Sequence, residues 1–336
     1  MKRNMYEWVQ NTIDSDVKKG FPVLSFPAIQ KLNISVKDFI SDPELQAKGM
    51  KVVADSTDAS ASVSLMDLSL EAECFGSEIR FSDEEVPTVI GSIVDTEEDA
   101  DALQIPEVGS GRTQIYLDAM KKAMELITDR PVFAGTIGPF SLAGRLMDVT
   151  NAMVYCYDEP DMVHTVLEKA TTFIINLING YKETGCNGVV VAEPLAGLLS
   201  PSLAEEFSAD YMKKIVDAVQ DENFVVCYHN CGNTTIQTID SILSINAKML
   251  HFGNAIDMAE MVKLVPEDII VMGNVDPAGQ FRNGTPESVK AATIDCMKAC
   301  AYKKNFVISS GCDIPPMSSW DNIQAFFDGV NEFYAS

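Results

Sequence analysis

The sequence is poor in basic residues. Its 336 residues hold 25 Lys and Arg against 49 Asp and Glu, a formal net charge of −24 at pH 7. A surface of this charge repels phosphate backbones, so we expect no binding to nucleic acid. No apolar run reaches the roughly 18 residues of a membrane-spanning helix, and the polar N-terminus MKRNMYEWVQNTIDSD lacks the apolar stretch of a secretory signal. These absences predict a cytoplasmic protein without membrane contact.

Cysteines and nucleotide-binding motifs are also sparse. Eight Cys are too few for a disulfide scaffold and fit a reducing compartment. No G-x-G-x-x-G follows a predicted strand and no Walker A motif is present, so neither phosphate-binding loop is expected. Five of the eight thiols fall in apolar or helical contexts typical of small buried side chains: Cys74, Cys156, Cys186, Cys296 and Cys300.

Short β-branched apolar runs, separated by amphipathic stretches, recur along almost the whole chain. Continuous apolarity predicts strands that are buried on both faces, as in a parallel sheet. Eight such runs occur, at residues 22–26, 60–66, 131–138, 187–193, 223–229, 247–253, 268–274 and 305–311. Apolar residues spaced three and four apart predict helices at 160–181, 202–219, 285–300 and 320–333.

Eight strands, nearly all followed by a helix, predict an α/β protein with a (β/α)₈ TIM barrel. Such a barrel needs about 250 residues. The surplus predicts an N-terminal helical extension and an insertion between strands 2 and 3, roughly residues 71–111. No internal repeat or domain boundary is evident, so residues 1–336 are expected to form a single domain. A doubly wound open sheet is the alternative.

Metal-binding side chains follow two of the predicted strands, at the end where a TIM barrel carries its active site. His229 and Cys231 lie two apart, so both project to the same side, and Cys312 has the equivalent place after the last run. Each residue alone also fits a packing role. Together, one imidazole and two thiolates would bind Zn²⁺ and leave a fourth position open. The two thiolates neutralise the ion, so a bound substrate thiol would ionise yet keep its nucleophilicity, as alkyl transfer to sulfur requires.

Five further positions are predicted to serve this site. Glu193 ends the fourth run and is interpreted as a catalytic group, either a displaceable zinc ligand or the acceptor of the thiol proton. Helix capping or ion pairing is the alternative for Glu193. Asn254, Asn274 and Asp276 are predicted to line the substrate pocket, with Asx turns as the alternative. Arg145 is predicted to anchor one acidic group of the substrate.

Several motifs resemble the uroporphyrinogen decarboxylase superfamily, and within it the zinc-dependent methylcobamide:coenzyme M methyltransferases. These motifs are YHNCGNT (228–234), MGNVDP (272–277), NGTPESV (283–289), SSGCDIPP (309–316), EAECFGSEI (71–79) and the pair Glu193-Pro194. The resemblance covers most of the chain and is strongest from about residue 187 onward. It implies a (β/α)₈ barrel with zinc bound by His229, Cys231 and Cys312.

One family motif is missing. The decarboxylases carry an R-Q-A-G-R segment that grips porphyrinogen carboxylates, whereas the first run here leads into Phe26-Pro27-Ala28-Ile29-Gln30-Lys31. Without that clamp, a chain of net charge −24 is ill suited to an octacarboxylate.

The resemblance therefore implies an enzyme that moves a methyl group from a methylcobamide, carried on a separate corrinoid protein, to a small thiol such as coenzyme M. Two alternatives stay open: a metal-free decarboxylase-like lyase of porphyrin biosynthesis, and a non-catalytic corrinoid- or tetrapyrrole-binding barrel. The sequence leaves several features undecided. These are the acceptor (coenzyme M, homocysteine, another thiol or a folate), the original methyl donor, a fourth zinc ligand and assembly into a homo-oligomer.

Overall fold

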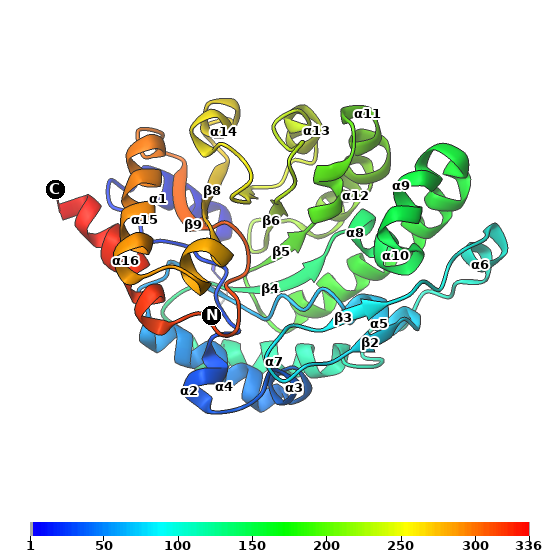
Figure 1. Ribbon diagram of the computed structural model, residues 1–336, viewed down its shortest axis with the longest axis horizontal. Helices are drawn as coiled ribbons and strands as arrows, with labels where there is room; N and C mark the ends of the chain where they lie inside the picture. The colour runs from blue at the N-terminus through cyan, green and yellow to red at the C-terminus, as the bar shows by residue number, and fades with distance from the viewer. Residues whose placement is uncertain (1–2, 336) are drawn as a thin grey trace.

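The computed structural model describes residues 3–335 (Figure 1). Within this range, seven parallel strands form one sheet that curls into a TIM-barrel-like fold with helices on its outer side. The strands are β1 (Ser62–Val63), β4 (Val132–Ile137), β5 (Gly188–Ala192), β6 (Val225–Asn230), β7 (Met249–Phe252), β8 (Ile270–Val275) and β9 (Phe306–Ser310). They are hydrogen-bonded in chain order, as successive βα units require.

The predicted first strand, residues 22–26, is not a strand in the structure. The extended segment that contains it lies between β9 and β1 and forms only isolated hydrogen bonds. The Phe21 amide donates to the Ile308 carbonyl over 2.9 Å, and the Ser60 amide donates to the Gly20 carbonyl over 2.9 Å. The Val23 amide donates to the side chain of Ser310 instead of to backbone. This segment therefore fills the eighth position of the barrel without a regular backbone ladder.

The predicted N-terminal helical extension is α1 (Met5–Asp14), which closes the N-terminal end of the barrel. Its buried face packs into the barrel interior, where the ring of Trp8 lies 6.2 Å from that of Phe133. The Met5 amide donates to the Glu222 carbonyl, just before β6 begins. Because α1 fills the N-terminal end of the barrel with apolar contacts, a binding site is expected at the opposite, C-terminal end.

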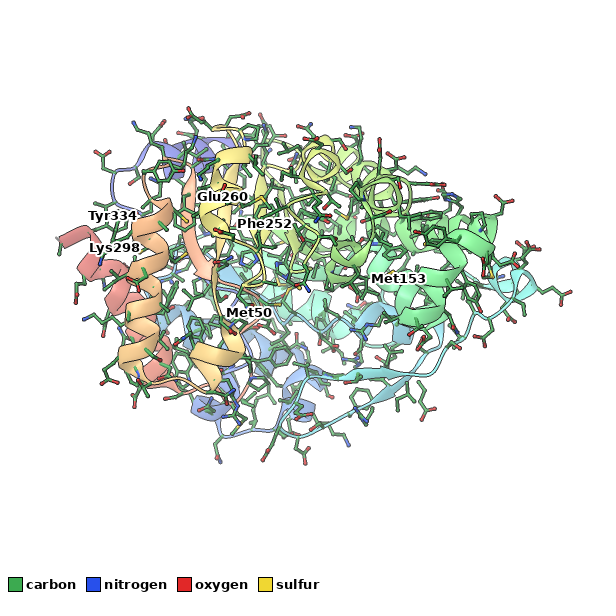
Figure 2. The ribbon with its side chains drawn as sticks, turned by 45° about the horizontal axis from the view of Figure 1, so that its top comes forward. Met50, Met153, Phe252, Glu260, Lys298 and Tyr334 are labelled. Atoms are coloured by element: carbon green, nitrogen blue, oxygen red, sulfur yellow. The ribbon has the colours of Figure 1, made fainter. Side chains whose placement is uncertain are left out.

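The outer helices bury their apolar faces against the sheet. In Figure 2, the buried Phe252 and Met50 lie beneath the outer surface, whereas the exposed Glu260 and Lys298 belong to outer helices. The four predicted helices correspond to α10 (Pro160–Glu183), α11 (Pro201–Ala204) with the π-helical turn η2 (Glu205–Ala209) and α12 (Asp210–Val219), α15 (Pro286–Cys300), and α16 (Trp320–Ala335). The remaining outer helices are α2 (Ala28–Leu32), α3 (Val36–Ser41), α4 (Pro43–Ser56), α7 (Thr113–Leu126), α8 (Pro139–Met147), α9 (Val149–Asp158), α13 (Ile239–Ser244) and α14 (Met258–Leu264). None of the described helices is both long and apolar enough to cross a lipid bilayer.

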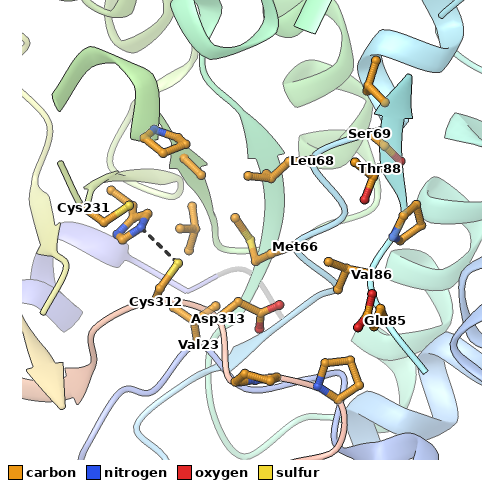
Figure 3. Close-up of a pocket in the computed structure, with 18 of the residues that line it drawn as sticks. Val23, Met66, Leu68, Ser69, Glu85, Val86, Thr88, Cys231, Cys312 and Asp313 are labelled. Carbon is orange, nitrogen blue, oxygen red and sulfur yellow. Dashed lines mark hydrogen bonds between the residues drawn. The ribbon is translucent and has the colours of Figure 1, made fainter. Parts of the chain in front are cut away.

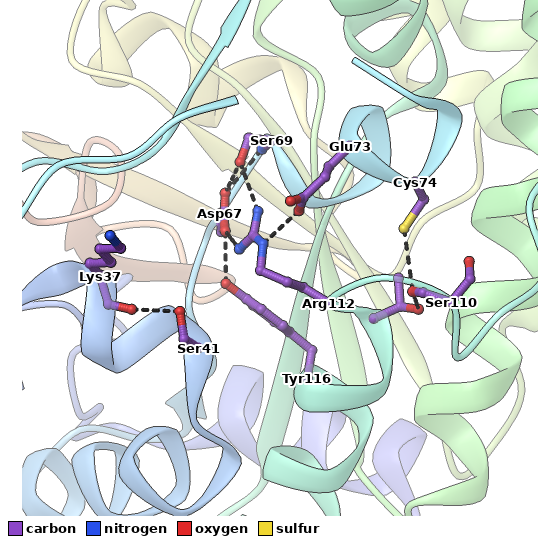
Figure 4. Close-up of polar contacts among 10 residues, drawn as sticks. Lys37, Ser41, Asp67, Ser69, Glu73, Cys74, Ser110, Arg112 and Tyr116 are labelled. Atoms are coloured by element: carbon purple, nitrogen blue, oxygen red, sulfur yellow. Dashed lines mark hydrogen bonds and ion pairs between the residues drawn. The ribbon is translucent and has the colours of Figure 1, made fainter. Parts of the chain in front are cut away.

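The predicted insertion lies between β1 and α7 and contains a small sheet of its own. It comprises α5 (Leu70–Phe75), an antiparallel hairpin of β2 (Glu78–Arg80) and β3 (Thr88–Ile90), and α6 (Glu97–Ala102). A buried polar cluster at its base joins the two ends of the insertion (Figure 4). There the Arg112 guanidinium donates to Asp67 and Glu73, and the Tyr116 hydroxyl donates to Asp67 over 2.8 Å.

Glu71 is fully buried at the start of the insertion. Its Oε1 accepts a hydrogen bond of 2.5 Å from the Thr136 hydroxyl, and its Oε2 has no partner among the described residues. Burial raises the pKa of Glu71 from 4.5 to about 7. The folded protein thus keeps a proton that the unfolded chain releases. The free energy of unfolding should therefore fall as the pH rises from about 4.5 to 7.

Glu71→Gln should remove this pH dependence. Relative to the wild type, the variant should be more stable at pH 8 than at pH 5 by about 1–3 kcal/mol. Urea unfolding at the two pH values measures the difference. The matched variant at an exposed position, Glu98→Gln, should show no such change. An equal effect of Glu71→Gln at both pH values would contradict the assignment.

Candidate metal centre

His229, Cys231 and Cys312 meet at the C-terminal end of the barrel (Figure 3). His229 lies near the end of β6, Cys231 follows that strand directly, and Cys312 follows β9. One ligand atom from each residue lies within 4.8 Å of the other two. The His229 Nε2 and the Cys312 Sγ are 3.5 Å apart. The structure thus brings together the three residues that the sequence marks as metal ligands.

The turn after β6 places Cys231 over the end of β7. The Asn230 side chain holds the turn: its Oδ1 accepts hydrogen bonds from the Gly232 amide over 3.0 Å and from the Thr235 hydroxyl over 2.9 Å. Gly253 allows the close approach, because a Cβ there would collide with Cys231. The position of this thiol therefore depends on a small residue at the end of the neighbouring strand.

The two thiols differ in acidity. The hydrogen bond between them lowers the pKa of Cys231, and the same bond, together with burial, raises the pKa of Cys312 to about 12. Cys231 therefore ionises first, and Cys312 holds the shared proton. Two thiols and one imidazole nitrogen at this spacing form a donor set that suits Zn²⁺. Among residues 3–335, no further His, Cys, Asp or Glu joins the cluster.

Sequence reasoning missed His251, which lies directly behind His229. The two are register partners on the parallel strands β6 and β7, and their Nδ1 atoms are 2.6 Å apart. Burial, followed by the neighbouring His229, lowers the pKa of His251 well below its ordinary value. The positions of the two histidines in their strands could have revealed the pair, because both residues face the barrel interior at the same level of adjacent strands.

Glu193 is not part of the cluster, which corrects its interpretation as a zinc ligand. Its carboxylate caps the N-terminus of α8, accepting hydrogen bonds from the Ser141 amide over 2.6 Å and the Phe140 amide over 3.0 Å. The first amides of a helix lack partners within the helix, so a carboxylate is favoured there. Burial nevertheless raises the pKa of Glu193 to about 7. Helix capping, the alternative left open by the sequence, describes these contacts.

The three polar residues expected to line the pocket do not line it. Asn274 Nδ2 donates to two carbonyls of the loop after β7, over 3.0 and 2.7 Å. Asp276 Oδ1 accepts from two backbone amides at the start of the π-helical turn η3 (Pro277–Arg282), over 2.9 and 2.8 Å. Asn254 is exposed. Asn274 and Asp276 thus satisfy loop backbone, as Asx-type contacts do.

A cavity of about 520 Å³ opens onto the three candidate ligands. Its wall near the barrel is largely apolar, and its outer wall comes from the insertion hairpin (Figure 3). The apolar residues include Val23, Met66, Leu68, Val190, Ala192, Val86 and Val89. Its charged residues are Glu84, Glu85, Asp313, Arg145 and Arg282. The insertion therefore shapes the entrance to the site.

Arg145 reaches this cavity from the last turn of α8. Within residues 3–335, no carboxylate pairs with its half-buried guanidinium, and burial lowers its pKa. A desolvated guanidinium without a partner is suited to bind an anionic group of a ligand. Arg282, at the end of η3, also lines the cavity and was missed by sequence reasoning, because nothing in its local pattern separates it from a solvated surface residue.

Comparisons with known proteins agree with this architecture. The family profile of uroporphyrinogen decarboxylase (URO-D) matches residues 23–333. The chain is 30% identical over 275 residues to the methylcobamide:CoM methyltransferase MtbA of Methanosarcina acetivorans, covering 80% of this chain and 78% of that protein. It is 25% identical over 323 residues to the uroporphyrinogen decarboxylase of Coxiella burnetii strain Dugway 5J108-111, covering 91% and 87%.

A solved structure of a methyltransferase from Methanosarcina mazei superposes with a TM-score of 0.86. At 23% identity it covers 97% of this chain and 98% of that one, which supports the fold. The family profile over residues 23–333 and the sequence relatives show that the chain belongs to the uroporphyrinogen decarboxylase family.

Proposed function

We propose that this protein is a zinc-dependent methyltransferase that moves a methyl group from a methylated corrinoid on a separate carrier protein to a small thiol. The observation that carries the proposal is the cluster of His229, Cys231 and Cys312 at the floor of a largely apolar cavity. Similarity to two methylcobamide:CoM methyltransferases supports it. Relatives within the family that are named as decarboxylases make the reaction class the first point to test.

In the proposed reaction, the cobalt–carbon bond breaks and leaves its electron pair on cobalt. The acceptor sulfur forms the new carbon–sulfur bond, and its proton is released to solvent. A zinc ion held by His229, Cys231 and Cys312 would supply the Lewis acidity that lowers the pKa of the acceptor thiol. The chain itself excludes water through the apolar wall and presents Arg145 to an acidic group of the acceptor.

The charge of the cavity argues against a decarboxylase. A porphyrinogen with several carboxylates needs a cationic pocket, whereas two Arg and three acidic residues line this one. Arg112, which donates to Ser69 of the cavity wall, is engaged by Asp67 and Glu73. The cavity therefore suits a ligand with few negative charges.

The proposal is tested on protein purified without chelator. We expect about one zinc per chain and demethylation of free methylcobalamin that depends on an added thiol. Chelation should abolish the reaction and zinc should restore it. Release of carbon dioxide from uroporphyrinogen by the chelated protein would overturn the methyltransferase assignment.

Arg145→Met should weaken the binding of an anionic thiol. The change keeps an unbranched apolar stem and removes the guanidinium charge, so KM for a thiol with a sulfonate or carboxylate should rise about 10–100-fold. KM for the neutral 2-mercaptoethanol should stay within about twofold, and Arg145→Lys should recover part of the loss. Steady-state kinetics of methylcobalamin demethylation measure both values. An equal rise for the two thiols would contradict the role of Arg145.

A further inference from the structure

A buried chain of polar groups leads from the candidate ligand His229 across the barrel interior. The His229 Nδ1 lies 2.6 Å from the His251 Nδ1, and the His251 Nε2 lies 2.7 Å from the Ser309 Oγ. The Ser309 Oγ in turn lies 2.6 Å from the Phe21 carbonyl oxygen. The three side chains are at most 4% exposed. Each group therefore needs the next one as its hydrogen-bond partner, because burying a polar group without a partner costs free energy of folding.

The Phe21 carbonyl, at the end of this hydrogen-bonded series, fixes the direction of every hydrogen bond in it. A carbonyl oxygen only accepts, so the Ser309 hydroxyl donates its proton to Phe21. The remaining lone pairs of Ser309 then accept from His251, which must carry its proton on Nε2. In the neutral imidazole this leaves the His251 Nδ1 as an acceptor.

The proton between His229 and His251 can be placed in the same way. A single proton lies between the two Nδ1 atoms, since two protons would collide and none would oppose two lone pairs. His251 accepts at this position, so His229 donates from Nδ1. The His229 Nε2 therefore carries a lone pair, which can accept from the thiol of Cys312, 3.5 Å away.

We propose that His251, supported by Ser309, is a positioning residue that fixes the Nδ1–H tautomer of His229 and so presents its Nε2 lone pair to the metal. The meaning of this tautomer for zinc rests on the proposed function, whereas the tautomer itself is a property of the protein without metal. A partner on the second nitrogen orients a histidine ligand and increases its basicity. His251 is neither in the candidate ligand cluster nor in the lining of the cavity, and acts through His229.

Two variants with the same branching and the same number of side-chain heavy atoms separate positioning from packing. In His251→Asn, an amide oxygen near the place of the His251 Nδ1 can still accept from His229. His251→Leu removes that acceptor. We expect zinc affinity, measured by competition with a chromophoric chelator, to fall about 10–100-fold in His251→Leu and to stay within about threefold of the wild type in His251→Asn. Equal losses in both variants would overturn the proposal in favour of packing.

The tautomers are read directly from nitrogen-15 chemical shifts of labelled, metal-free protein. The sequence has three His, and His164→Gln identifies the signals of the third. We expect His229 protonated at Nδ1 and His251 at Nε2, with His229 leaving this single tautomer in His251→Leu. A wild-type His229 protonated at Nε2 would overturn the proposal. This measurement uses neither zinc nor a methyl donor, so its outcome is independent of whether the protein transfers methyl groups.

Discussion

Cys312→Ala is expected to lower thiol-dependent demethylation of methylcobalamin by at least about a thousandfold. The substitution removes one of three candidate ligands and one of the two thiolate charges that would neutralise Zn²⁺. Zinc content should fall well below one per chain. The change in the corrinoid absorbance spectrum measures the rate, and metal analysis of the same sample measures zinc.

The matched control is Cys300→Ala, which removes a fully buried thiol on α15, away from the cluster. This variant should keep both zinc and activity. Decarboxylation of uroporphyrinogen that survives chelation and Cys312→Ala would replace the proposed function with a metal-free lyase. The barrel itself would be unaffected by that result.

Arg112→Met is expected to lower the free energy of unfolding by about 3–5 kcal/mol. The guanidinium is the charged partner of Asp67, whose side chain is fully buried, so its loss leaves a carboxylate in the protein interior without a counter-charge. Urea denaturation measures the loss. As a control, Lys290→Met breaks an exposed pair with Glu332 and should cost less than about 1 kcal/mol.

A second substitution tests this explanation. Asp67→Asn in the Arg112→Met background removes the unpaired charge and keeps an oxygen that can accept from Tyr116. The double variant should therefore be more stable than Arg112→Met alone. The double variant could instead be less stable than the wild type by the full sum of the two single losses. In that case the buried charge would not be the cause of the instability of Arg112→Met.

The sequence predicted the barrel and the grouping of His229, Cys231 and Cys312 because both depend on where strands end. Seven of the eight apolar runs are strands, and parallel strands bring the residues after β6 and β9 to the same end of the sheet. The prediction of a strand at residues 22–26 was wrong. Apolarity alone does not show whether an amide donates to backbone or, as the Val23 amide does, to a side chain.

The roles of Glu193, Asn274 and Asp276 were harder to predict. A polar residue directly after a strand has the same local pattern whether it faces the cavity or a nearby helix N-terminus. For Glu193 the outcome depends on where α8 begins, which is a tertiary feature. His251 was missed for a related reason, because its partners His229 and Ser309 come from other strands and are far away in the sequence.

The hairpin of β2 and β3 forms a separate two-stranded sheet, although residues 84–89, from its connecting loop and β3, contribute to the cavity wall. Its strands share no ladder with the barrel strands that carry the candidate ligands. The outer wall of the cavity and the candidate metal ligands are consequently encoded in separate stretches of the chain. Substitutions in the hairpin can reshape the entrance while the barrel register that positions the thiols stays intact. Under the proposed function, this separation would let changes in the hairpin alter which acceptor or carrier protein fits while the candidate metal ligands keep their places.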